Sequence, residues 1–92
     1  MTKSELIEAV SSKVENFSRK DIEVIVDTLF GSMTESLAKG EKIEIRGFGS
    51  FKVKERDGRV GRNPKSGESI YIESKRVPFF KAGKELKERV NR

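Results

Sequence analysis

The segment EKIEIRGFGSFKVK, residues 41–54, decides the fold. Apolar side chains occupy alternate positions in two short runs, first at Ile43 and Ile45 and then at Phe51 and Val53. A period of two is typical of a strand with one buried face. Two glycines between the runs permit a tight turn. We therefore predict two antiparallel strands with charged outer faces.

A helical period precedes this segment. Thr2 and Glu5 have the spacing of a capping box at the start of a first helix, which is predicted over residues 3–14. Ser18 begins a second helix, whose apolar residues keep a helical period until Gly40 ends it. The pair could be a DNA-reading helix-turn-helix, but the second helix is acidic where a recognition helix needs groove-reading side chains. We expect a structural helix pair.

Residues 55–75 have the composition of an exposed arm. They contain few large apolar side chains and centre on RNPKSG, residues 62–67, which is good chemistry for a hairpin turn. Two strands of about ten residues would reach ~33 Å, and such an arm is expected to be flexible until it meets a partner. Pro78 is expected to end the return strand, and residues 82–90 predict a last short helix.

Composition limits the classes of function. Hydrophobic residues make up 34% of the 92 residues, and adding the 8 glycines still leaves the chain just short of a usual globular composition. A core shared with a second copy would compensate. The chain has no cysteine and no histidine, which removes the commonest general base and metal ligands, so no catalytic residue, metal or cofactor is predicted. It has no long apolar run, and we expect a soluble, intracellular protein.

The net charge of +5 is unevenly distributed. Residues 1–40 contain 5 Lys/Arg and 7 Asp/Glu, whereas residues 41–92 contain 15 and 8. A slender basic ribbon fits a DNA groove, and phosphate neutralisation would supply most of its affinity. Charge alone would favour a solvated charged loop, but the geometry of the arm favours binding. The basic residues of the arm are Lys54, Arg56, Arg59, Arg62 and Lys65.

Pro64 lies at the expected tip of the arm and allows two interpretations. It can simply form the turn, because its ring presets φ. It can also be an apolar wedge that enters between base pairs, unstacks them and bends the duplex, while Arg59 and Arg62 hold the arm in the minor groove. The two roles are compatible, since the turn is what presents the ring.

Three segments together carry a resemblance to a known family. They are GFGSF at residues 47–51, GRNPKSG at residues 61–67 and VPFFKAGKELK at residues 77–87. In this order and at this spacing the chain resembles the HU/integration host factor family of bacterial histone-like DNA-bending proteins, over essentially its whole length. The run EKIEIR, residues 41–46, is most similar to the beta-type subunits of the integration host factor branch.

The resemblance implies an α+β fold in an intertwined dimer, with an N-terminal helix pair, an antiparallel β-sheet saddle with extended β-ribbon arms, and a short C-terminal helix. Residues 1–92 would form a single domain, with a helical dimerisation part at 1–40, sheet and arm at 41–81 with the tip near 62–67, and the last helix at 82–92. The implied function is architectural: the dimer binds the minor groove and bends or compacts double-stranded DNA, which supports nucleoid organisation, recombination and transcription regulation.

Matching positions assign roles to individual residues. The arm contacts with DNA would be Arg59, Arg62, Asn63, Pro64 and Lys65. Phosphate contacts along the saddle and flanks would be Lys3, Lys75, Arg76, Lys81 and Lys84. Sequence preference would depend on Glu44 and Arg46, and the dimer core would contain Phe48, Phe51 and Phe80. Lys54 and Arg56 add basic charge near the base of the arm.

The implied partners are double-stranded DNA and a second chain, in either a homodimer or a heterodimer with a related alpha-type subunit. The implied place is the bacterial nucleoid in the cytoplasm, with no membrane and no small-molecule substrate. Two departures from the family pattern bear on the stiffness of the arm. Asp57-Gly58 puts an acid and a flexible residue inside it, and Val60 stands where the family usually has threonine.

Other classes of function fit less well. A membrane-surface or general polyanion binder needs a cationic amphipathic helix, and the long helix here is acidic to neutral. A protein-interaction scaffold could use the arm to extend another protein's sheet. DNA binding would weaken steeply with salt, whereas sheet extension would depend on it little. An enzyme comes last, because the usual catalytic side chains are missing.

Overall fold

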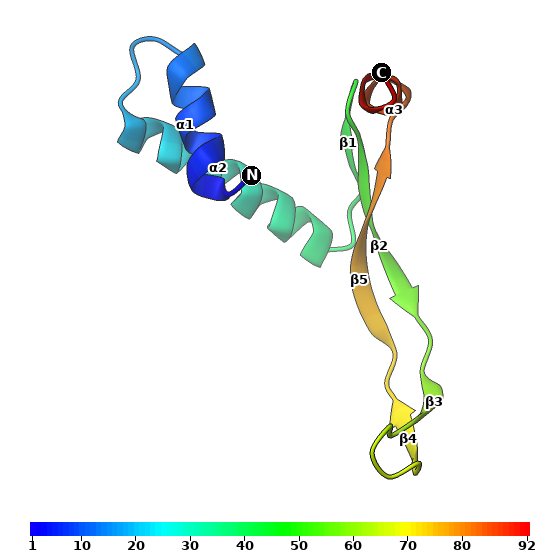
Figure 1. The fold of residues 1–92 in the computed structure, drawn as a ribbon. Coiled ribbons are helices and arrows are strands. Elements are labelled where there is room, and N and C mark those ends of the chain that lie inside the picture. Colours follow the sequence, from blue (N-terminus) through cyan, green and yellow to red (C-terminus); the bar gives the residue numbers. More distant parts are fainter. The chain divides into compact units, whose positions relative to one another are not determined.

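The computed structural model describes residues 1–92, which form two compact units, Met1–Glu35 and Ser36–Arg92. Helices and antiparallel strands are both present, which confirms the α+β class (Figure 1). No helix combines the length and the apolar character needed to cross a membrane. The elements in chain order are α1 (Lys3–Lys13), α2 (Arg19–Ala38), β1 (Ile43–Ile45), β2 (Gly49–Arg56), β3 (Arg59–Arg62), β4 (Ser69–Ile72), β5 (Lys75–Ala82) and α3 (Lys84–Val90).

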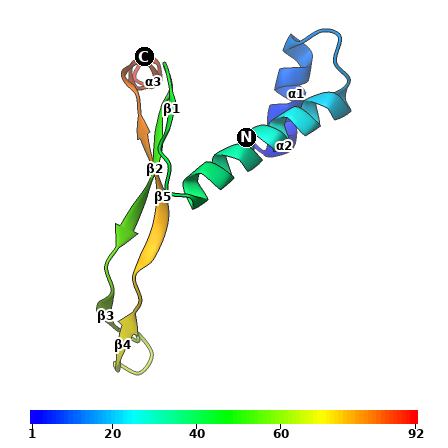
Figure 2. The same cartoon turned by 180° about the vertical axis from the view of Figure 1, so that it is seen from behind.

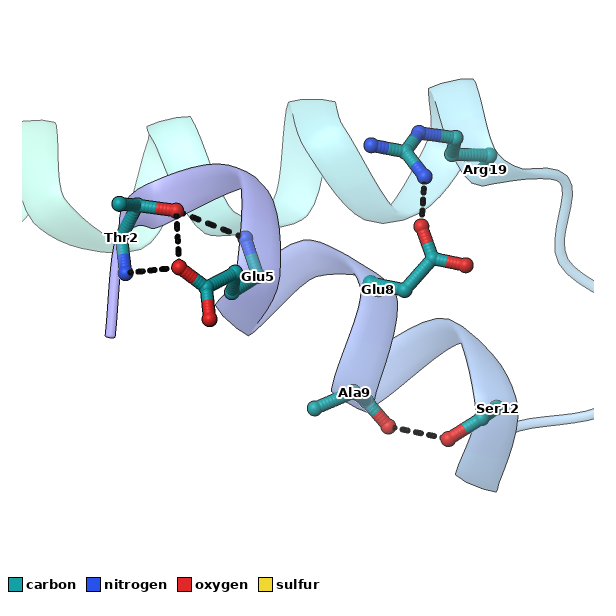
Figure 3. Close-up of polar contacts among 6 residues, drawn as sticks. All are labelled: Thr2, Glu5, Glu8, Ala9, Ser12 and Arg19. Carbon is teal, nitrogen blue, oxygen red and sulfur yellow. Dashed lines mark hydrogen bonds and ion pairs between the residues drawn. The ribbon is translucent and has the colours of Figure 1, made fainter.

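The predicted capping box begins α1 (Figure 3). The Thr2 hydroxyl accepts a hydrogen bond from the Glu5 backbone N–H at 3.2 Å, and the Glu5 carboxylate accepts one from the Thr2 N–H at 3.3 Å. These bonds satisfy two of the backbone donors that a helix start leaves unpaired. The helix ends at Lys13, one residue before the predicted end, because Val14 has extended backbone angles.

Both ends of α2 follow the sequence prediction closely. The Ser18 hydroxyl accepts from the Asp21 N–H at 3.1 Å, and the Asp21 carboxylate accepts from the Ser18 N–H at 3.2 Å. At the other end Gly40 has a φ of 82°, and its N–H donates to the carbonyl of Leu37 at 2.9 Å. A left-handed glycine that satisfies a terminal carbonyl is the usual end of a helix.

The core of the first unit is very small. In the whole chain only Ile7, Ile22 and Val26 are buried apolar residues, and Leu6 and Val10 pack against them. An ion pair between Arg19 and Glu8 also joins the two helices (Figure 3). In contrast, α2 leaves large apolar side chains about half exposed: Val24, Ile25, Leu29 and Phe30.

The second unit is built on a three-stranded antiparallel sheet in the order β1-β2-β5. Ile43 lies opposite Phe51, and Phe51 lies opposite Phe80, so one row of apolar side chains crosses all three strands. Figures 1 and 2 show β2 and β5 as a long twisted pair. Gly47, with a φ of 82°, forms the predicted tight turn between β1 and β2.

The prediction that Pro78 ends the return strand is wrong. β5 continues through it to Ala82, with Pro78 opposite Val53 of β2. The physical reason is that β5 is an edge strand of this sheet, where a residue without an N–H can avoid the ladder. For the same reason the last helix starts later than predicted: Ala82 still pairs with Gly49, and α3 begins at Lys84.

The arm also differs from the two uninterrupted strands of about ten residues that the sequence suggested. Its outer part, β3 and β4, is a separate two-stranded sheet. Two dipeptides outside any strand, Asp57-Gly58 and Glu73-Ser74, separate it from β2 and β5. The last pair before the interruption is Arg56 with Lys75, and the first pair after it is Arg59 with Ile72.

Candidate nucleic-acid interface

Strand register gathers basic side chains on one face of the three-stranded sheet. Successive residues of a strand point to opposite faces, and residues directly opposite each other share a face. Arg56 is paired with Lys75 and Ser50 with Lys81, so these side chains lie on one face of the sheet. We call this the basic face, and its charged residues are Lys52, Lys54, Arg56, Lys75, Lys81 and the single acid Glu44.

The basic face differs in two details from the predicted DNA contacts. Lys52 belongs to the face but is missing from the predicted contacts, although its alternation with Lys54 in the sequence indicates a shared face. Arg76 pairs with Glu55 and therefore lies on the opposite face. Its guanidinium donates to the carbonyl of Ala38 at 3.4 Å, where a cation complements the negative end of α2.

Away from Glu55 and Arg76, the opposite face is apolar, and it carries the three phenylalanines assigned to a dimer core. The ring of Phe80 lies 4.6 Å from that of Phe51 and 5.4 Å from that of Phe48, measured between centroids. These are favourable tilted contacts. The cluster is nevertheless open to solvent, because Phe48 is 42% exposed and Phe80 37% exposed.

One basic side chain is held in place by an aromatic ring. The Lys54 Nζ lies 3.5 Å from the centroid of the Phe79 ring, which shares the basic face. A cation over a ring face is attracted by the ring's quadrupole, by roughly 0.5–1 kcal/mol at exposed sites. The contact keeps this ammonium group close to the sheet surface.

A basic hollow lies where β1, β2, β5 and the start of α3 meet. It is an open depression of about 690 Å³. It brings together four residues selected from sequence, namely Glu44, Arg46, Lys81 and Lys84. Lys42 and Lys87, which the sequence did not predict as DNA contacts, add two further positive charges. With five cations against one acid, the hollow suits an anionic group such as a phosphate.

The arm tip is an ordered turn stabilised by its own backbone. The Asn63 side-chain carbonyl accepts from the Lys65 N–H at 2.9 Å, and the Asn63 backbone carbonyl accepts from the Gly67 N–H at 2.7 Å. Gly67 has a φ of 73°, a conformation that a residue with a side chain rarely adopts. Pro64 is fully outside the turn's hydrogen bonds and exposed. The turn therefore presents the proline ring to solvent, which is compatible with either interpretation of this residue.

Two close contacts organise the outer arm. An added Cβ at Gly58 would lie 2.1 Å from the Tyr71 hydroxyl oxygen, and one at Gly61 would lie 2.7 Å from the Ile72 Cδ1. Side chains of β4 thus cover glycines on the other side of the hairpin, which stabilises a glycine-containing ribbon. Pairing places Arg59 opposite Ile72 and on the face of the hairpin away from Tyr71.

Most of the selected cations are available to a ligand. No salt bridge or hydrogen bond engages the charged groups of Arg46, Arg56, Arg59, Arg62, Lys65, Lys75 and Lys81. Lys84 makes a long 4.0 Å pair with Glu88. In the helical unit Lys3 pairs with Asp27 at 2.8 Å, and this hydrogen bond and opposite charge raise the pKa of the Lys3 ammonium above its ordinary value.

No group of three or more His, Cys, Asp or Glu side chains is arranged to hold a metal ion. A basic sheet face, a basic hollow and a two-stranded arm with free arginines together define a nucleic-acid-binding protein.

Comparison with known proteins gives the family. Residues 1–91 match the family described as bacterial DNA-binding protein. The chain is 58% identical over 91 residues to the integration host factor subunit beta of Methylococcus capsulatus. The alignment covers 99% of this chain and 96% of the relative. The chain is 56% identical to the same subunit of Alkalilimnicola ehrlichii, covering 99% and 91% of the two chains.

Solved structures agree. A cocrystal structure of Anabaena HU with DNA has a TM-score of 0.90 at 39% identity, covering 98% of this chain and 97% of that one. HU from Thermotoga maritima has a TM-score of 0.68 at 41% identity, covering 98% of each chain. The chain belongs to the bacterial DNA-binding protein family of HU and integration host factor, whose members are architectural DNA-binding proteins and not enzymes.

Proposed function

We propose that this protein binds double-stranded DNA as a dimer and bends it, with the arms in the minor groove and Pro64 as the wedge at each tip. The observation that carries the proposal is the arm itself: a hairpin with free arginines that presents an exposed proline at its end. Minor-groove architectural proteins, among which HU and integration host factor are standard examples, kink DNA by roughly 20–90° with such apolar wedges.

The basic face and the basic hollow would supply the sequence-independent affinity. Each phosphate that a lysine or arginine neutralises releases counterions, so binding should weaken steeply with salt. Lys75, Lys81 and Lys84 would contact phosphates, while Glu44 and Arg46 at the hollow would contribute to sequence preference. Among the predicted phosphate contacts, Arg76 has the least structural support, because it lies on the opposite face of the sheet and donates a hydrogen bond to the end of α2. Lys3 would need to exchange Asp27 for a phosphate.

A dimer is supported by how little apolar surface one chain buries. Three buried residues are too small a core for 92 residues, and the exposed apolar side chains of α2 and the Phe48, Phe51 and Phe80 cluster form large uncovered surfaces. A second chain would cover them, since closed twofold dimers are the commonest assembly. Either an identical chain or a related alpha-type subunit could do this.

In this proposal the whole chain, residues 1–92, acts as one domain: 1–40 for dimerisation, 41–81 for the sheet and DNA-binding arm, and 82–92 as the terminal helix. Its place would be the bacterial nucleoid in the cytoplasm. The relatives named as integration host factor subunits support a role in nucleoid organisation, recombination and transcription regulation.

The test is energy transfer between dyes at the two ends of a duplex of about 35 base pairs. This duplex is much shorter than the ~150 base-pair persistence length, so it stays nearly straight unless the protein bends it. The parent protein should raise the transfer, with a titration end point of two chains per duplex. Pro64→Ala should bind with a similar salt dependence but give a smaller rise. Lys65→Ala is the matched control at the same tip. Because a dimer carries two copies of the substitution, it should reduce the salt slope by about 2 while keeping the transfer at saturation.

Binding with no rise in transfer for the parent protein would leave a basic DNA-coating protein and refute the bending proposal. A Pro64→Ala variant that bends as well as the parent would reduce the proline to a turn-former. An end point of one chain per duplex would contradict the dimer.

A further inference from the structure

The interruption between β2 and β3 holds a chemically reactive dipeptide. Asp57 and Gly58 lie after the last pair of the inner ladder, Arg56 with Lys75, and outside any strand (Figure 1). The Asp57 side chain is exposed and its carboxylate takes part in no hydrogen bond or ion pair. No backbone hydrogen bond holds the Gly58 N–H. Both reacting groups are therefore free.

We infer that Asp57-Gly58 is a site of spontaneous isoaspartate formation, and that this modification inactivates the arm. The Gly58 backbone nitrogen attacks Cγ of the Asp57 carboxyl group in its protonated form. The new N–Cγ bond closes a five-membered succinimide, and the hydroxyl group of the carboxyl leaves as water with the nitrogen's proton. Glycine favours this step, because it has no side chain to block the approach of its nitrogen to Cγ. Water then opens the ring at either carbonyl, with no change in oxidation state.

Opening at the carbonyl that belonged to the main chain gives isoaspartate. The chain then passes through Cβ and Cγ of residue 57, and the former main-chain carbonyl becomes a free carboxylate. The net change adds one methylene group to the backbone and consumes no co-reactant, since the water lost in the first step is returned in the second.

The other two aspartates of the chain are protected. Asp21 and Asp27 both lie in α2, where helical hydrogen bonds fix the backbone, and each is followed by a β-branched residue. Their carboxylates are also engaged, Asp21 with the Ser18 N–H at 3.2 Å and Asp27 with the Lys3 Nζ at 2.8 Å. They are internal controls for the reactivity of Asp57.

Isoaspartate at residue 57 would impair the arm because of where it lies, and this effect rests on the proposed DNA bending. An extra methylene lengthens only the side of the ribbon that leads into β3, whereas the Glu73-Ser74 side keeps its length. A change of length on one strand shifts pairing register, and register determines which face each side chain occupies. Isoaspartate would also displace Gly58 from the Tyr71 ring that covers it. Arg59 and the tip would then no longer meet the groove together.

The experiment ages the full-length protein at neutral pH and 37 °C beside Asp57→Glu, which keeps the charge but would have to close a larger and much slower six-membered ring. Peptide mapping with isoaspartyl methyltransferase and S-adenosylmethionine measures isoaspartate at each aspartate. We expect at least about tenfold more at residue 57 than at residues 21 and 27, since the helical sites react only after local unfolding. Tyr71 is the only tyrosine and the chain has no tryptophan, so its fluorescence reports directly on the site and should change only in the parent.

Bending is measured on the same samples. Transfer at saturation should fall in proportion to the isoaspartate content of the parent and stay constant for aged Asp57→Glu. Isoaspartate at residue 57 no higher than at the helical aspartates would overturn the site, and a fully isomerised protein that bends DNA normally would overturn its effect on the arm. If the fresh protein does not bend DNA, the proposed function fails, while the mapping still decides the chemistry.

Discussion

Replacing Gly49 by alanine tests how tightly β2 and β5 are packed. A Cβ at this position would lie 2.5 Å from the backbone oxygen of Lys81 and 2.6 Å from the Phe80 Cζ, well inside the 3.4 Å at which ordinary contact begins. The Lys81 oxygen belongs to the backbone and cannot rotate away, and Phe80 is held by the other two rings of its cluster. The strands would have to separate at this point.

Overpacking of this kind costs about 1–3 kcal/mol, and the backbone clash places Gly49→Ala near 2–3 kcal/mol. A domain of this size loses about 4–8 °C in Tm per kcal/mol, so we expect a decrease of roughly 10–20 °C. Thermal and urea unfolding followed by circular dichroism measure both values. All variants must be compared at one protein concentration, because the stability of a dimer depends on it.

Ser50→Ala is the matched control. It lies next to Gly49 on β2, adds no atom, and removes a hydroxyl that makes no hydrogen bond. Its free energy of unfolding should stay within about 0.5 kcal/mol of the parent. A free energy of unfolding for Gly49→Ala within the same limit, about 0.5 kcal/mol from the parent, would refute the reasoning. The strands would then have room for a Cβ that the distances to Lys81 and Phe80 exclude.

Two further predictions concern the helical unit. Thr2→Ala removes the hydroxyl that accepts the Glu5 N–H and should lower the free energy of unfolding by about 1 kcal/mol in urea titrations, whereas Ser4→Ala, in the same turn, should change little. The pKa of Lys3, raised by Asp27, should fall in Asp27→Asn when followed by NMR, and an unchanged pKa would contradict the ion pair. Because the pKa is raised on folding, the pair's stabilisation is complete below the unfolded pKa of Lys3 and is lost as the pH rises through its folded pKa.

Local structure was largely predictable from the sequence. The caps at Thr2 and Ser18, the end of α2 at Gly40 and the strands on either side of Gly47 were all expected, because capping, left-handed glycines and two-residue alternation are properties of neighbouring residues. The class of protein was equally accessible, since the charge asymmetry and the family segments are written in the chain.

The predictions that were wrong concern features of a strand that depend on its neighbouring strands. Pro78 looks like a terminator in isolation, yet it continues β5 because β5 lies at the edge of the sheet. The arm looked like one ribbon, whereas pairing stops at Asp57-Gly58 and Glu73-Ser74 and resumes beyond them. Neither the position of a strand in its sheet nor the extent of its ladder follows from local periodicity.

The sequence by itself determined the elements, the class of protein and the basic character of its second half, because these depend on residue types and on short spacings. Only the tertiary structure decided which charges act together. Cross-strand register placed Lys75 and Lys81 of β5 on the face that holds Lys52 and Lys54 of β2, and turned Arg76 to the opposite face. The fold also gathered the cations of the hollow from both ends of β1, from β5 and from α3. The physical reason is that a face exists only once strands distant in sequence are paired, and pairing fixes the direction of every side chain at once.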